Sequence, residues 1–495
     1  MVYDQRETPY YKALLEYTRS DVLTFHVPGH QKGRGAHPLM FELLGEKALV
    51  ADTTQVLGLD DMHQPHGPAK FAQELAAIAY GADATFFLIN GSSSGNHIMI
   101  LSVCRPGDKV ILPRNSHRSA IGALILSGVK PVYVMPEFDM EMRVDHTVTP
   151  EKFEKAISEN PDAKALFVLS PTYYGATADL KTIVEVGHRN DMVVIVDEAW
   201  GPHLHFHPEL PDSAMDAGAD LCVNSTHKLI AGMSQGSMIH VQGHRVDYGH
   251  LHSVLRLFLS TSPSCLIVSS LDVARMQMFF HGRDLLDKAL KNADWARERI
   301  NNIPGLHTWG EEIIGRPGVA GFDRTRLVIS SREAGFTGYQ MERFLRYDHN
   351  IQIEMSDLFN VLALVTIAHT REDMEKLVRA LECVVKDHRG EGDLPRLREE
   401  HRTGQTGIQL PDWPPQVMTP RDAFFSDYRT IPFPHAAGHI SAELITPYPP
   451  GIPLVCPGER ITSEIINYAL LELAAGVRIQ GPVDDTLGTI KVVNE

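Results

Sequence analysis

Between residues 69 and 242, short hydrophobic runs alternate with longer amphipathic stretches. The runs are ATFFLIN, DKVILP, PVYVM, ALFVLSP, MVVIVDEA, DLCVNST and GSMIHV, and they are apolar on both faces and rich in β-branched residues. Strands buried between two layers of helices have this pattern, whereas half-exposed strands alternate apolar and polar positions. The pattern therefore predicts an α/β fold, a doubly wound domain around a mostly parallel sheet.

The pattern changes on both sides of this region and predicts further domains. Apolar spacing close to 3.6 residues predicts a long helix at 265–302 that connects two domains. A second α/β stretch follows it, then a segment rich in charge, glycine and proline. The expected division is an N-terminal arm and linker at 1–68, a large domain at 69–305, a small α/β domain at 306–390, a linker at 391–417 and an α+β domain at 418–495.

Composition narrows the classes of partner. The 62 acidic and 46 basic residues give a net charge of −16, which opposes binding to nucleic acid phosphates and favours a cationic ligand. No apolar run approaches the 18 residues of a membrane span, so no membrane partner is expected. The five cysteines are far apart and lack CxxC spacing, which argues against disulfides and suits a reducing cytoplasm.

Two charged side chains are expected at the carboxyl ends of buried strands, where α/β sheets bind ligands. Lys228 follows DLCVN in STHKLIAG, and Asp197 ends the run MVVIVD. A carboxylate beside a pyridine ring keeps the ring nitrogen protonated, so that the ring can accept electrons when a bond at a substrate Cα breaks. The alternatives are a lysine on a surface loop and an aspartate at a helix N-cap.

A possible phosphate site and a histidine extend this pattern. LINGSSSGNHIM at 88–99 predicts a strand, a turn at 91–95 and a helix, whose free N–H groups could bind a phosphate. It matches neither GxxxxGKS/T nor GxGxxG, so a monophosphate suits it better than a nucleotide. His117 follows another strand and could lie over a flat ring, or it is an ordinary loop histidine. Together these residues fit pyridoxal 5′-phosphate (PLP) carried on a lysine.

Eight segments form an ordered set along nearly the whole chain. They are FHVPGHQKG (25–33), LGLDDMHQPHGP (57–68), NGSSSGN (90–96), NSHRS (115–119), VDEAWGPH (196–203), STHKLIAG (225–232), STSPS (260–264) and ITPYPPGIPLVCPGE (445–459). In this set the chain resembles the Orn/Lys/Arg decarboxylase family, and within it the short bacterial form that includes arginine decarboxylases. The resemblance implies the aspartate-aminotransferase-like large domain of fold-type-I PLP enzymes.

The resemblance also implies a role for each matching residue. Lys228 forms the Schiff base with PLP, Asp197 pairs with the ring nitrogen and His117 stacks on the ring. The remaining implied contacts are Ser93, Ser94 and Ser225 on the phosphate, His227 beside the lysine as a candidate proton donor, Ala199 against the other face of the ring, and Trp200 and His203 at the border of the pocket.

An oligomer and a substrate follow from the same resemblance. Ser262 belongs to a segment that reaches the site of a neighbouring subunit, so a homodimer or a higher oligomer is expected. The expected reaction is decarboxylation of a basic L-amino acid, with arginine, which would give agmatine and CO2, favoured over lysine and ornithine. Glu443, just before PYPPG, is the expected partner of the distal cation, with Asp60 and Asp61 as the next candidates.

Two departures from the family pattern loosen the choice of substrate. Gln31 stands where a lysine is common, and Trp200 is typical of the long enzymes. Other function classes stay open as well. An aminotransferase or lyase would reuse the lysine, the aspartate and the phosphate turn, and alternating histidines in PHLHFH (202–207) could bind zinc. A protein without enzymatic activity would have no need of Lys228 or Asp197.

Overall fold

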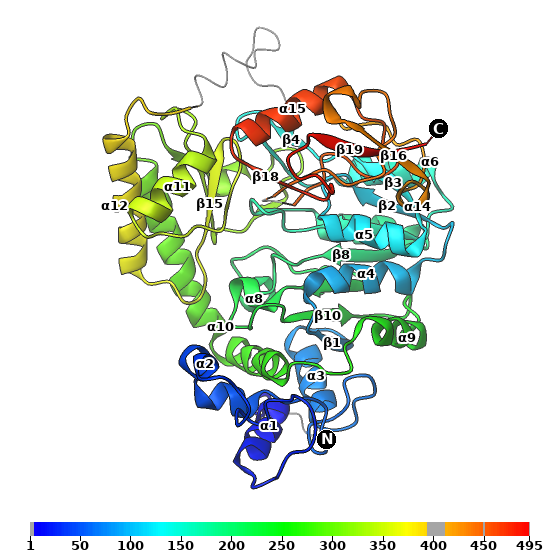
Figure 1. Ribbon diagram of the computed structural model, residues 1–495, viewed down its shortest axis with the longest axis vertical. Coiled ribbons are helices and arrows are strands. Elements are labelled where there is room, and N and C mark those ends of the chain that lie inside the picture. Colours follow the sequence, from blue (N-terminus) through cyan, green and yellow to red (C-terminus); the bar gives the residue numbers. More distant parts are fainter. Residues whose placement is uncertain (1–3, 394–410, 449–450, 495) are drawn as a thin grey trace. The chain divides into compact units, whose positions relative to one another are not determined.

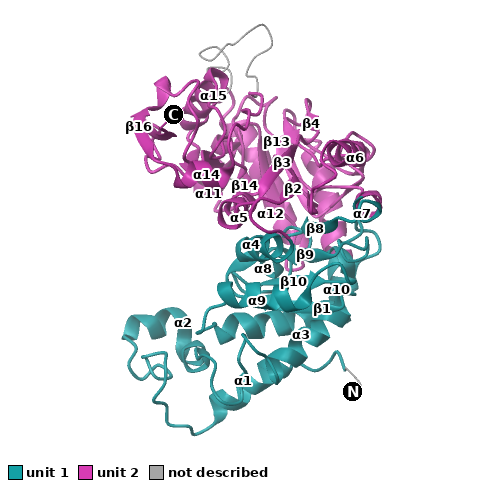
Figure 2. Cartoon of the chain, turned by 90° about the vertical axis from the view of Figure 1, so that its right-hand side faces the viewer, with its two compact units in different colours: residues 1–103, 187–286 teal, residues 104–186, 287–495 magenta. Residues whose placement is uncertain are grey.

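The computed structural model describes residues 4–393, 411–448 and 451–494. It divides into two compact units, of which unit 1 contains residues 1–103 and 187–286 and unit 2 contains residues 104–186 and 287–495 (Figure 2). The domain boundaries expected from the sequence stay predictions. Residues 394–410 of the expected linker lie outside the described residues.

The sheet of unit 1 has the strand order β1-β10-β9-β8. Strands β8 and β9 are parallel, with Asp197 opposite Val223, whereas β10 is antiparallel to both β9 and β1. The parallel pair brings two strand ends to the same edge of the sheet. The strands are β1 (Ala84–Leu88), β8 (Val193–Asp197), β9 (Leu221–Asn224) and β10 (Ser237–Val241).

Helix α4 (Gly91–Val103) packs on this sheet and contacts all four strands (Figure 1). A Cβ atom on Gly95 would lie 2.5 Å from Cγ2 of Val223, so only glycine allows this approach of helix and strand. The sequence predicted a turn at 91–95, and this was wrong, because the helix already begins at Gly91. Only Gly91, with a φ of 72°, keeps a turn conformation.

The N-terminal arm of unit 1 is helical and anchored by a polar contact. The backbone N–H of Tyr10 donates to Oδ2 of Asp272 at 3.0 Å, and Tyr10 and Leu14 join a core with Val268 and Leu271. The long helix expected at 265–302 is found as α10. The other elements are α1 (Pro9–Arg19), α2 (Pro38–Ala51), α3 (Pro68–Ala79), η1 (Leu204–Phe206), α8 (Thr226–Leu229), α9 (Tyr248–Phe258) and α10 (Cys265–Ile300), which continues into unit 2 from Asp287.

In unit 2, β2 pairs in parallel with both β3 and β6. With the strands of unit 1, this accounts for all seven hydrophobic runs that predicted strands. The parallel pairs confirm a mostly parallel α/β architecture. The elements are β2 (Lys109–Pro113), α5 (Arg118–Ser127), β3 (Lys130–Val134), β4 (Phe138–Asp139), β5 (Val144–Asp145), α6 (Pro150–Glu159), β6 (Ala165–Leu169), β7 (Ala176–Thr177) and α7 (Leu180–Arg189).

A second sheet of unit 2 is antiparallel and has the order β11-β13-β15-β14. Helices α11 and α12 share a hydrophobic core with it. Both helices begin with capping boxes, at Thr337 and Thr370. The elements are β11 (His307–Thr308), η2 (Glu311–Ile313), β12 (Gly321–Phe322), β13 (Arg326–Ser330), α11 (Gly338–Asp348), β14 (Met355–Ser356), β15 (Asn360–Leu364) and α12 (Arg371–Asp387).

The C-terminal part of unit 2 combines short strand pairs with two helices. Strand β16 pairs with β19, and β17 pairs with β18, both antiparallel. Its core gathers Phe433, Ile445 and Ile465, all with 0% exposure. The elements are α14 (Pro420–Phe425), β16 (Tyr428–Pro432), η3 (Phe433–His435), β17 (Thr446–Tyr448), α15 (Ser463–Ala474), β18 (Arg478–Gln480) and β19 (Thr489–Val493).

Candidate active site

Lys228 lies in the single-turn helix α8, directly after β9, as the sequence predicted. Its backbone N–H donates to the carbonyl of Ser225 at 3.1 Å, which fixes the start of the turn. Its Nζ lies 3.8 Å from the centre of the Trp200 ring. An ammonium over an indole face is attracted by the negative charge of that face, so Trp200 helps to orient the amine.

Asp197 is the last residue of β8 and is 3% exposed. Its Oδ2 accepts a hydrogen bond from Nδ2 of Asn96 at 2.7 Å, and its Oδ1 accepts one from the N–H of Ala199 at 3.1 Å. Burial raises the pKa of Asp197, although the bond from Asn96 and the charge of Lys228 lower it. A turn follows β8 rather than an α-helix, so Asp197 is not a helix N-cap. In its ionised form, such a buried carboxylate is stabilised by a nearby cation.

Glu198, the next residue, has a structural role of its own. Its Oε1 accepts from the N–H of Ala214 at 2.6 Å, and its Oε2 accepts from Nδ2 of Asn224 at 2.8 Å. Burial raises the pKa of Glu198 to about 8. The two adjacent acids therefore bind different partners.

The predicted phosphate residues gather around the start of α4. Ser225 contacts Ser92, with the two Oγ atoms 2.7 Å apart, whereas Oγ of Ser94 donates to the carbonyl of Gly91 at 2.8 Å. Ser93 is exposed. The sequence did not predict a role for Ser92, because the three serines of GSSSG look equivalent there. They differ only in the direction in which each side chain leaves the helix. The first turn of α4 also presents N–H groups of the kind that bind phosphate.

His227 lies beside Lys228 with its Nδ1 2.9 Å from the carbonyl oxygen of Gly236. A carbonyl only accepts, so Nδ1 carries a proton, and in the neutral ring Nε2 has the lone pair. Burial lowers the pKa of His227, while the bond to Gly236 raises it. The neutral ring is thus suited to take up a proton at Nε2, and it can donate one there only after being protonated.

The other predicted residues of this unit are described more briefly. Ala199, Trp200 and His203 are all buried, in the turn after β8. Ser262 is exposed in the segment before α10, and its N–H donates to Oγ of Ser260 at 3.1 Å. Asp60 accepts hydrogen bonds from four backbone N–H groups of its own loop and of α3, which gives it a structural role.

His117 and Glu443 belong to unit 2. His117 is the N-cap of α5, and its Nδ1 accepts from the N–H of Ser119 at 3.2 Å. Glu443 is 8% exposed, and its two carboxylate oxygens accept from the N–H groups of Val483 at 3.0 Å and Lys491 at 2.9 Å. Pro449 and Pro450 of PYPPG lie outside the described residues. The predicted roles of His117 on the ring and of Glu443 on the substrate stay predictions.

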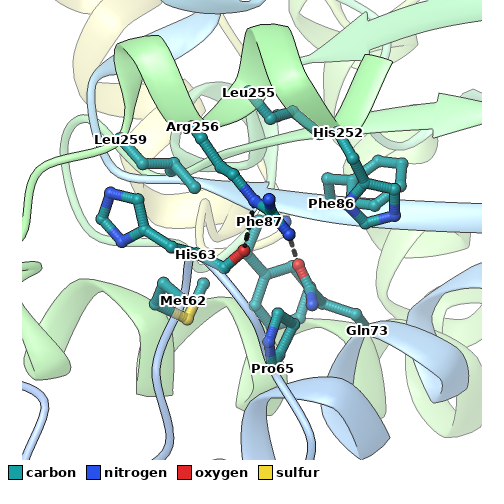
Figure 3. A pocket seen from close by; sticks show the side chains of 10 residues that line it. All are labelled: Met62, His63, Pro65, Gln73, Phe86, Phe87, His252, Leu255, Arg256 and Leu259. Atoms are coloured by element: carbon teal, nitrogen blue, oxygen red, sulfur yellow. Dashed lines mark hydrogen bonds between the residues drawn. The ribbon is translucent and has the colours of Figure 1, made fainter. Parts of the chain in front are cut away.

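A small hollow in unit 1 involves none of the predicted site residues (Figure 3). It encloses about 300 Å³, with the solvent at its mouth included. Its polar groups already bind the chain, because Nε of Arg256 donates to the carbonyl of His63 at 3.0 Å. Oε1 of Gln73 likewise accepts from the N–H of Phe87 at 2.9 Å. These contacts make the hollow a packing feature.

The histidines of PHLHFH do not alternate along an extended segment, because η1 occupies part of it. His205 instead contacts Asp216, with its Nδ1 2.9 Å from Oδ1. Across the described ranges, no three His, Cys, Asp or Glu side chains come together as metal ligands would. The helices found there also include none that is both long and apolar enough to cross a bilayer.

Comparison with known proteins identifies the family. The model of the Orn/Lys/Arg decarboxylase major domain matches residues 8–373, and that of the C-terminal domain matches residues 407–490. The chain belongs to the Orn/Lys/Arg decarboxylase family. An arginine decarboxylase of Bacillus subtilis is 43% identical over 99% of both chains. Lysine decarboxylase LdcA of Pseudomonas aeruginosa is 27% identical over 93% of this chain and 75% of its own.

The solved structure of a lysine decarboxylase shows the same fold. The lysine decarboxylase LdcF of Francisella novicida superposes with a TM-score of 0.83 at 24% identity, covering 98% of this chain and 81% of its own. The family and this likeness confirm the predicted fold-type-I α/β architecture and the decarboxylase activity on basic amino acids. The alternatives of an aminotransferase and of a lyase other than a decarboxylase therefore do not hold. Asn96 and Ser92 join the candidate site as residues that the sequence did not single out.

Proposed function

We propose that this protein is a PLP-dependent arginine decarboxylase, which converts L-arginine to agmatine and CO2. The observation that carries the choice of substrate is its similarity to an arginine decarboxylase over the full length of both chains. The lysine decarboxylase relative is much less similar. The net charge of −16 also favours a cationic substrate over an anionic one.

The residues of unit 1 suit PLP. Lys228 offers an amine at a strand end, and Asp197 is a buried acid whose pKa the charge of Lys228 lowers. Ser92, Ser94 and the first turn of α4 supply hydroxyl and N–H groups of the kind that hold a phosphate. Ser225 stands against Ser92 and would share this role.

When bound, PLP supplies a protonated pyridine ring that accepts the electron pair left by the departing carboxyl group. The chain provides the surroundings for that chemistry. Asp197 would hold a proton on the ring nitrogen, and the hydrogen bond from Asn96 fixes one oxygen of its carboxylate. His227 would move a proton through Nε2, and the contact of its Nδ1 with the carbonyl of Gly236 supports this role.

The substrate is tested by the release of CO2 from L-arginine, L-lysine and L-ornithine, with the amine product measured in the same samples. We expect kcat/KM to be at least about tenfold higher for arginine, since a guanidinium and an ammonium ask for different arrangements of acceptors. A preference for lysine or ornithine would overturn the choice of substrate and leave the decarboxylase activity intact. Formation of a keto acid in place of CO2 would contradict both.

Glu443→Gln is expected to raise KM for all three amino acids by roughly tenfold, the size of a charge-assisted hydrogen bond. Two backbone N–H groups hold the Glu443 carboxylate at a fixed place, and each of its oxygens has a further lone pair. Asp484→Asn is the matched control, because Asp484 also accepts from backbone N–H groups of this segment. If Glu443→Gln lowers Tm and leaves KM unchanged, Glu443 is only a structural brace.

A homodimer is the proposed minimal assembly. The N-terminal arm exposes large apolar side chains, including Leu57 at 100% and Phe25 at 91%, and such a surface is typical of a protein interface. Light scattering should give twice the chain mass of 55.0 kDa. Phe25→Glu should shift the mass towards that of one chain, whereas a dimer unaffected by this change would place the interface elsewhere.

The scattered cysteines support a cytoplasmic location.

A further inference from the structure

A fully buried ion pair in unit 2 joins the end of β2 to the C-terminal part of the chain. Arg114 is 0% exposed and Glu459 is 1% exposed. Nε and Nη2 of Arg114 donate to Oε1 and Oε2 of Glu459, both at 2.7 Å. This is the bidentate geometry in which guanidinium and carboxylate fit each other best. The Trp413 ring lies 4.5 Å from the guanidinium carbon and covers it.

The same two side chains hold the segment 451–459 along its length. Nη1 of Arg114 donates to the carbonyl of Pro453 at 2.8 Å. Oε2 of Glu459 also accepts from the N–H of Cys456 at 2.7 Å, which closes a turn. The ion pair therefore pins this segment to the residue that begins the loop 114–117.

The first residue of this segment, Gly451, lies beside His117. The carbonyl of Gly451 accepts from the N–H of Arg118, the first residue of α5, at 3.1 Å. A Cβ atom at Gly451 would lie 3.4 Å from both Cδ2 and Nε2 of the His117 ring. Nδ1 of the ring accepts from the N–H of Ser119, so one edge is held by the helix and the other faces Gly451. The imidazole thus lies next to residue 451, so a displacement of residue 451 would reach the ring.

We propose that Arg114 and Glu459 are positioning residues of the cofactor site, which hold segment 451–459 against α5 and so fix the His117 imidazole. The proposal rests on the proposed contact of His117 with PLP. Neither Arg114 nor Glu459 touches the reacting atoms in this account, because both act through Gly451 and His117. Through Glu459, the C-terminal part of this chain would contribute to binding the cofactor.

The test measures the dissociation constant of PLP by titrating the apoprotein, together with the Tm of the apoprotein. Glu459→Gln keeps the shape of the side chain and removes its charge, so Arg114 loses its ionic partner. We expect the dissociation constant to rise on the order of tenfold, as for other residues that orient a ligand-binding side chain. Asp272→Asn is the control, because it breaks a pair of equal burial with Arg275 that touches neither α5 nor 451–459. It should lower Tm and leave PLP affinity unchanged.

A double-mutant cycle with His117→Ala separates positioning from general destabilisation. If Glu459 acts through His117, adding Glu459→Gln to His117→Ala should not weaken PLP binding further. Fully additive losses, or unchanged PLP affinity in Glu459→Gln, would overturn the positioning role alone. Unchanged affinity in His117→Ala would instead overturn the contact of His117 with PLP, and the inference with it.

Gly451→Ala provides a second variant should Glu459→Gln fail to fold. Gly451 has a φ of 91°, so alanine strains the backbone beside the imidazole while the ion pair stays intact. We expect weaker PLP binding here as well, again without a further loss in the His117→Ala background. Full PLP affinity in Gly451→Ala would contradict the path through residue 451.

Discussion

Lys228→Ala should lose decarboxylation by at least about a thousandfold, because its amine is the proposed point of covalent attachment. The protein should still fold, since the side chain is only partly buried and alanine is favourable in the helical turn α8. CO2 release and the visible absorbance of the bound cofactor should both disappear. Tm of the apoprotein should stay close to that of the parent.

Lys130→Ala is the matched control for this change. Lys130 is exposed at the first residue of β3, so its loss removes one positive charge without touching the candidate site. It should retain parental activity and absorbance. A Lys228→Ala variant that works nearly as well as the parent would contradict the assignment of the cofactor lysine.

Asp197→Asn should lower kcat on the order of a thousandfold, with a much smaller effect on KM. The asparagine keeps the shape of the side chain but removes the negative charge that holds a proton on the ring nitrogen. Because the contribution is made as negative charge develops on the reacting group, the loss falls on the chemical step. Steady-state kinetics with saturating PLP measures it, and a variant with parental kcat and only a raised KM would refute this role.

Asn96→Ala tests the same acid from the other side. Its bond stabilises the ionised form of Asp197, so its loss should raise the pKa of Asp197 further. On acidification the carboxylate then becomes protonated at a higher pH, so the acid limb of the pH–rate profile should shift to higher pH. Asn224→Ala is the control, because Asn224 binds Glu198 instead. An acid limb that stays in place in Asn96→Ala would rule out this coupling.

The strands and the placement of Lys228 and Asp197 were predictable because local pattern determines them. A run of β-branched apolar residues predicts a buried strand, and the residue after the strand is then at the sheet edge. Each of the seven hydrophobic runs between residues 69 and 242 forms a strand, as this pattern predicts. The start of α4 was not predictable in this way, since Gly and Ser favour both turns and helix starts.

Contacts between residues that are far apart in the sequence could not be predicted from local pattern. Ser92 and Ser225 are 133 positions apart, and Asn96 and Asp197 are 101 apart, so only the folded chain shows that they meet. The backbone N–H groups that Glu443 binds are equally invisible in the sequence. The sequence can thus suggest that an acid beside a motif is functional. It does not show which backbone groups already donate hydrogen bonds to that acid.

Reductive trapping tests the central claim most directly. The purified protein is loaded with PLP, treated with borohydride and digested, and the modified peptide is identified by mass spectrometry. We expect one pyridoxyl group per chain, on the peptide that contains Lys228, and its absence when an excess of L-arginine has released the lysine before reduction. A label on another lysine, or no stable label in a protein that still releases CO2 from arginine, would contradict it.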